Sequence, residues 1–134
     1  MFIEVNNMTE QSPSLIGAVV RALRKARGLG VNQLSAALEV EAANLSRFER
    51  GLPGGVSIAR YLDAIAFRLG TCGSVIYAIA EYTSDDPALL DNPEKLGLMT
   101  DHLTNLVKNY LTLPLAAQQD IDGIIKHHAN TQTQ

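Results

Sequence analysis

Residues 41–51 read EAANLSRFERG, and this stretch decides the fold of the chain. Leu45 and Phe48 are its large apolar side chains, and their spacing of three residues places both on one face of a helix over about 42–50. Gly51 ends that helix, because glycine adopts the left-handed conformation of a helix end at little cost. The pattern predicts a short helix with one face in a core and one polar face left outside.

The residues just before it predict a partner helix. Leu34 and Leu38 recur at helical spacing within a helix expected over 31–38. Only E39-V40-E41 separates the two helices, so their connection is tight. This arrangement of helix, tight turn and helix is a helix-turn-helix motif.

Apolar residues at i, i+3 and i+4 spacing predict helices on both sides of this motif. Ser12 and Pro13 are the expected entry of the first, with Ser12 as the N-cap. Ser57 caps the helix that follows the motif. The further helices are expected at about 14–27, 58–69, 73–82, 94–111 and 114–129.

Residues 28–51 resemble the lambda-repressor/Cro-like family, also called XRE-type. That family reads G-L-[ST]-Q-x-x-L-A-x-x-L-G-V and then S-x-x-x-[IL]-S-[RK]-[IFW]-E-R-G, and this chain reads GLGVNQLSAALEV followed by EAANLSRFERG without a gap. The resemblance extends over about 14–70. It implies that the second helix of the motif reads DNA, and that Arg24 and Glu49 form a structural ion pair.

The fold class expected is therefore all-α: a five-helix lambda-repressor-like helix-turn-helix domain followed by a C-terminal helical hairpin. The segment TSDDPALLDNP is acidic and holds two prolines, which favours a linker. The expected organisation is a flexible arm at 1–12, the DNA-binding domain at 13–83, a linker at 84–93 and a helical dimerisation or interaction element at 94–134.

The charge is divided between the two halves of the 134-residue chain. Residues 14–70 hold eight Arg and Lys against four Asp and Glu, whereas residues 71–134 hold three against eight. The formal net charge of −3 therefore hides a basic block that suits phosphates and an acidic block that does not.

Several positions depart from the family pattern. Val31 replaces a Gln that contacts phosphate, Glu39 replaces the Gly of the turn, and Glu41 replaces the Ser that opens the reader helix. The two main base-reading positions are Ala42 and Ala43, whose methyl groups suit a thymine methyl. The predicted DNA-binding residues are Asn32, Gln33, Glu41, Ala42, Ala43, Asn44, Arg47 and Arg50.

The two C-terminal helices are acidic outside and aliphatic inside, which leaves two interpretations. They dimerise the protein, as a palindromic DNA site requires, or they only extend the core of the first domain. The predicted dimerisation residues are Leu96, Met99, Leu103, Leu106, Tyr110, Ile121, Ile124 and Ile125.

Other classes of function find little support. The single cysteine, Cys72, forms neither a disulfide nor a thiolate metal site alone, and His127-His128 with His102 lack ligand spacing. No nucleophile–base set or phosphate loop is present, so neither an enzyme nor a cofactor or metal is expected. The absence of a signal pattern or long apolar run predicts a cytoplasmic protein without a membrane span.

The sequence thus favours a sequence-specific DNA-binding transcriptional regulator, a homodimeric repressor that docks the helix at 42–50 in the major groove of double-stranded DNA. The alternative is an antitoxin or another protein-interaction module, which neutralises a protein partner and binds its own promoter secondarily.

Overall fold

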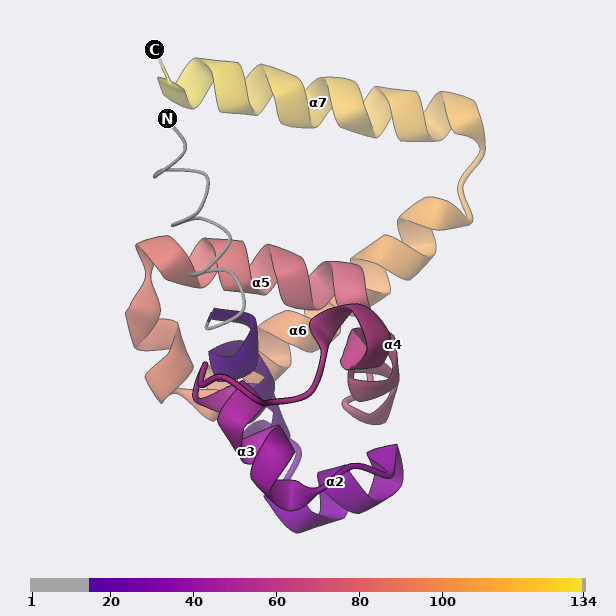
Figure 1. Cartoon of the computed structure of the whole chain (residues 1–134). Helices are drawn as coiled ribbons and strands as arrows, with labels where there is room; N and C mark the ends of the chain where they lie inside the picture. Colours follow the sequence, from indigo (N-terminus) through magenta and orange to yellow (C-terminus); the bar gives the residue numbers. More distant parts are fainter. Residues whose placement is uncertain (1–14, 134) are drawn as a thin grey trace, which may run out of the picture.

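The computed structural model describes residues 15–133, and every regular element in that range is helical (Figure 1). The elements are a helix at 15–26, α2 (Val31–Leu38), α3 (Ala42–Glu49), α4 (Ile58–Arg68), α5 (Gly73–Asp85), the 3-10 helix η1 (Pro87–Asp91), α6 (Pro93–Leu111) and α7 (Leu115–Thr133). The predicted all-α fold is confirmed. The expected arm at 1–12 and the Ser12-Pro13 helix entry lie outside the described residues.

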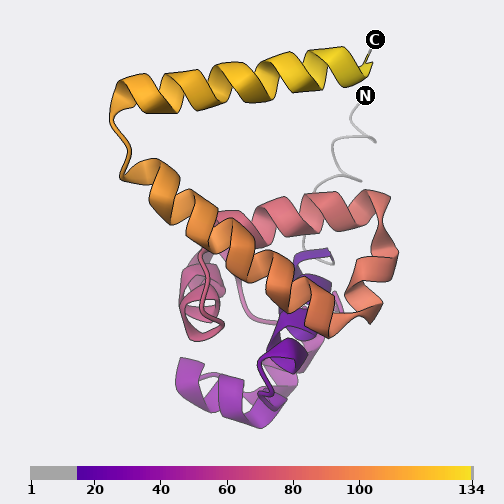
Figure 2. The same cartoon turned by 180° about the vertical axis from the view of Figure 1, so that it is seen from behind.

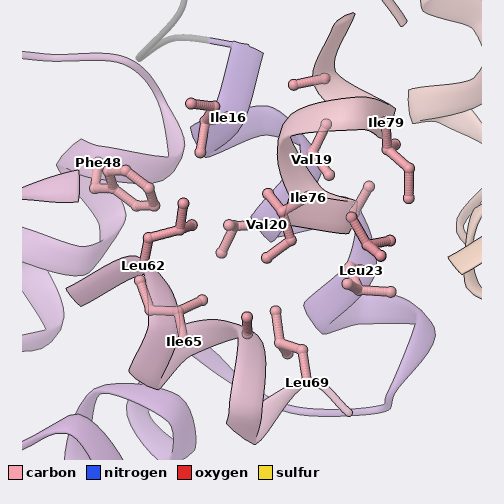
Figure 3. Close-up of a cluster of buried hydrophobic side chains, with 14 of the residues drawn as sticks. Ile16, Val19, Val20, Leu23, Phe48, Leu62, Ile65, Leu69, Ile76 and Ile79 are labelled. Atoms are coloured by element: carbon pink, nitrogen blue, oxygen red, sulfur yellow. The ribbon is translucent and has the colours of Figure 1, made fainter. Parts of the chain in front are cut away.

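The helix at 15–26 is the centre of the core. Its apolar stripe points into a cluster to which α3, α4 and α5 contribute (Figure 3). Val19, Val20, Leu23, Ile65 and Ile76 are all fully buried there. Several helices therefore bury their apolar faces against one central helix, which is how a short chain of amphipathic helices gains a single core.

Two glycines let α3 pack closely against its neighbours. A Cβ atom on Gly17 would overlap the carbonyl oxygen of Phe48, and one on Gly55 would lie 2.6 Å from the Phe48 backbone nitrogen. No side chain fits in either place, so glycine permits backbone contact on both sides of α3. Helix 15–26 and the loop after α3 thus fix the position of α3.

Residues 84–93, expected as a linker, are packed into the domain. They complete α5 and form η1, where Leu89 is buried and Leu90 packs against the core. The Asn92 side chain then caps α6 by accepting a hydrogen bond from the Lys95 backbone nitrogen at 3.2 Å. Apolar burial by two leucines keeps this acidic, proline-containing segment ordered against the helices.

The C-terminal helices open away from the rest of the molecule. The first half of α6 packs against the core with one face, whereas α7 turns back and stands apart from the other helices, at the end of the molecule farthest from α2 (Figures 1 and 2). The elbow between them is fixed by Gln118, whose Nε2 donates to the carbonyl oxygens of Tyr110 and Leu113. The Tyr110 hydroxyl also donates to Asp122 Oδ1 at 2.8 Å.

Candidate nucleic-acid interface

The two helices of the motif cross around a small apolar contact. Leu34 and Leu38 of α2 and Leu45 of α3 are buried between them, and α2 also packs against α4. Glu39 holds the turn in the left-handed conformation, with φ 57°, where the related family has glycine. The strain of a non-glycine residue there is offset by backbone hydrogen bonds from Glu39 and Val40 to the end of α2.

A buried ion pair braces α3 from behind. Arg24 Nε donates to Glu49 Oε2 at 2.7 Å, and Arg24 Nη2 donates to Glu49 Oε1 at 2.9 Å. The remaining nitrogen, Nη1, donates to the Leu29 carbonyl oxygen at 2.8 Å. The two residues are only 8% and 5% exposed, and the hydrogen bond with Glu49 raises the pKa of the Arg24 guanidinium. Arg24 therefore joins helix 15–26, the next loop and the end of α3.

The face of α3 opposite the core is exposed and basic. Ala43, Arg47 and Arg50 are exposed along it, and Ser46 is half-buried between them. These four residues, here called the α3 ridge, are the side chains that a groove would meet first. Sequence reasoning omitted Ser46, although its position one turn before Arg50 places it on the same face.

The other predicted residues of α3 lie at the flanks of this ridge. Ala42 and Asn44 are half-buried, on opposite sides. The Asn44 Oδ1 atom accepts a hydrogen bond from Arg47 Nη1 at 3.2 Å, which leaves the other nitrogens of Arg47 free for an acceptor. Asn44 therefore orients Arg47, and the alanine methyl on the ridge lets a partner approach the backbone closely.

The start of α2 presents one free polar side chain and one that is engaged. Asn32 is exposed. Gln33 is exposed as well, but its Oε1 accepts from the Gly30 backbone nitrogen at 2.7 Å and so caps the helix. A phosphate contact by the Gln33 amide would have to compete with this hydrogen bond.

An acidic residue, Glu41, precedes α3. It is exposed at the N-terminus of α3, and its carboxylate makes no capping hydrogen bond. The helix dipole favours a negative charge at this end. A carboxylate in general repels a phosphate, and it can accept a hydrogen bond from a cytosine amino group.

The predicted dimerisation residues divide into two groups. Leu96 is fully buried, and Met99 and Leu103 pack against the core of the same chain. Farther along, Leu106, Ile124 and Ile125 are each about 60% exposed, and Tyr110 and Ile121 are half-buried. Of the predicted dimerisation residues, those at the beginning of α6 therefore extend the core, and those at its end and on α7 are wholly or partly exposed.

Residues 15–133 contain no cluster of three or more His, Cys, Asp and Glu side chains that could hold a metal ion. Within the same range no single helix is long and apolar enough to span a membrane; the bent pair α4 and α5 passes such a test only by length and composition.

Comparison with known proteins agrees with this geometry. Residues 15–71 match the family model described as a helix-turn-helix domain. Neither the curated proteins nor the solved structures gave a match to the chain. The matched range runs from the central helix to residue 71, between α4 and α5, and includes the motif and its bracing ion pair. Residues 15–71 are thus a helix-turn-helix domain, consistent with the XRE-like family of such domains.

Proposed function

We propose that this chain is a sequence-specific regulator of transcription, a dimeric repressor that docks α3 in the major groove of a palindromic operator. A helix-turn-helix domain indicates DNA binding. The sequence specificity, the dimer and the repression are inferences from the residues that the domain presents.

The observation that carries the proposal is the α3 ridge. Arg47 and Arg50 are exposed on it, and Arg47 is oriented by Asn44. An arginine held in this way suits the two acceptors of a guanine edge or a phosphate. The ion pair beneath the ridge fixes α3 to the core, so these side chains project from a rigid support.

The ridge offers few base-reading groups, because Ala43 occupies its first turn. We infer that direct readout is limited to Arg47 and a thymine methyl beside the alanine. Positions outside these contacts would be selected through DNA shape and through the spacing of two half-sites.

The test is selection of bound sequences from a random DNA pool at moderate salt. A palindrome is expected, and Arg47→Ala should abolish its enrichment while the circular dichroism spectrum stays unchanged. Arg68→Ala is the matched control, because Arg68 is also exposed but lies at the end of α4, away from the ridge. Enrichment that persists in Arg47→Ala would refute the assignment of the ridge.

A second function, an antitoxin-like module whose main partner is a protein, is favoured by the apolar surface at the end of α6 and on α7. Leu106, Ile124 and Ile125 are exposed there. If the pool shows no enrichment but the wild-type chain binds and neutralises the product of an adjacent gene, this second function holds instead.

A further inference from the structure

Helix α7 carries a narrow, mainly apolar seam, most of which is not covered by the part of the chain that the structure describes. Ala117, Ile121, Ile124, His128 and Thr131 follow one another at alternating spacings of four and three residues. This is the heptad spacing of a helix that pairs with one other helix along its length. Ile124, in the middle of the seam, is 59% exposed.

The hydrogen bonds of the elbow with α6 use the neighbouring face of α7, whereas Ala117 and Ile121 of the seam itself are half-buried. Gln118 and Asp122 make the hydrogen bonds to α6, and both lie beside the seam on one flank of the helix. Figure 1 shows α7 standing clear of α5 and of the helix-turn-helix motif beyond the elbow. Ile124, His128 and Thr131 are exposed, so the described residues leave this later part of the seam uncovered.

We propose that the seam pairs with α7 of a second copy of this chain, running antiparallel about a two-fold axis between residues 122 and 123. This inference rests on the proposed function, since it supplies the dimer that a palindromic site requires. In this register Ile121 faces Ile124 of the second copy, and Ala117 faces its His128. A small residue thus meets a large one at each end of the pair, and isoleucines meet in the middle.

The charges beside the seam favour the antiparallel direction. Asp120 and His127 lie on the same flank, one in each half of the helix. Antiparallel pairing brings Asp120 of one copy to within two residues, or about 3 Å along the axis, of His127 of the other. Parallel pairing would instead place Asp120 beside Ile125 of the second copy. An acid therefore meets a base only in the antiparallel pair.

The direction of pairing is tested by disulfide cross-linking of the full chain, in a Cys72→Ser background. Two variants, Ala117→Cys and His128→Cys, carry tags of different length and are mixed and oxidised without DNA. The antiparallel register predicts the mixed dimer as the main product. The two like cysteines would be about 16 Å apart along the axis, beyond disulfide reach. Like-with-like products would show a parallel pair and overturn the inference, as would no cross-link at all.

The seam itself is tested by solution mass from analytical ultracentrifugation. Ile124→Asp should raise the dimer dissociation constant at least tenfold. Leu115→Asp should leave it unchanged, because Leu115 is 68% exposed on the opposite face of the same helix. Both side chains are exposed in the single chain, so neither change should unfold it, and circular dichroism checks this. Equal effects of the two changes, or none from Ile124→Asp, would overturn the inference.

The experiments distinguish a failure of the proposed DNA-binding function from a failure of the proposed α7 pair. A chain that selects a DNA sequence but does not give the mixed cross-link keeps its proposed function and loses the antiparallel pair. A chain that gives the mixed cross-link but enriches no DNA keeps the pair and loses the assignment as a DNA regulator.

Discussion

The buried ion pair between Arg24 and Glu49 should contribute far more to stability than the exposed pair between Arg27 and Asp101. The two pairs have the same shortest N–O distance, 2.7 Å, but Asp101 has 53% of its side chain exposed and Glu49 has 3%. Arg24→Met would leave the Glu49 carboxylate buried without a cation and the Leu29 carbonyl oxygen without its donor. Such a loss costs about 3–5 kcal/mol.

The assay is urea denaturation followed by circular dichroism. A loss of about 3–5 kcal/mol is a third or more of the stability of many domains, so the midpoint should fall sharply. The control, Asp101→Asn, should cost less than about 1 kcal/mol, because water screens an exposed pair. In Arg24→Met/Glu49→Leu much of the loss should be recovered, since no unpaired charge remains. Equal losses in Arg24→Met and the control would refute this reasoning.

Three further changes test other parts of the fold. Gly17→Ala should lower the free energy of unfolding by about 1–3 kcal/mol, because the new methyl group overlaps the backbone of α3. Gly123→Ala should raise it slightly, because a Cβ atom there has nothing within 4 Å and alanine favours a helix. Thermal denaturation of the two variants compares these effects. The hydrogen bond to Asp122 raises the pKa of the Tyr110 hydroxyl above its ordinary value of 10.0. The bond therefore supports the elbow below pH 10.0 and is lost as the pH rises through the raised pKa of Tyr110. Asp122→Asn should lower the pKa of Tyr110, which an absorbance titration measures. Glu41→Ser should tighten binding to all DNA sequences in a gel-shift assay, and an altered sequence preference would instead make Glu41 a base reader.

The helix-turn-helix part of the fold could be predicted closely from local signals. The bounds of α2 match the prediction at both ends, and α3 ends one residue earlier than expected. Gly30 marks the start of α2 and Gly51 marks the end of α3. The three-residue turn between the two helices leaves little room for error in the other two helix ends. Where the signals are weaker the prediction is less accurate: α5 continues to Asp85 because no glycine or proline interrupts it before Pro87.

The role of residues 84–93 could not be predicted from composition. Acidic residues and prolines indicate a loop locally, but whether that loop packs depends on what surrounds it. Leu89 reaches the core because α5 and α6 lie on either side of η1. The role of Gln33 could not be predicted from its residue type either. Its type and position suit a phosphate contact, yet its side-chain oxygen accepts a hydrogen bond from the Gly30 backbone nitrogen at the start of α2.

The apolar periodicity of α6 likewise does not show which of its apolar residues are buried. Leu96 and Leu106 both belong to its apolar pattern, yet the first is fully buried and the second is 63% exposed. The helix is 19 residues long, about 28 Å, and only its first half runs beside the core. Its N-terminal half is anchored by burial and by the Arg27–Asp101 pair, and its C-terminal end is joined to α7 by the elbow. A continuous helix thus connects the DNA-binding domain rigidly to the exposed seam. If two copies pair through α7, the distance between their α3 ridges is set by α6, and the operator must match it.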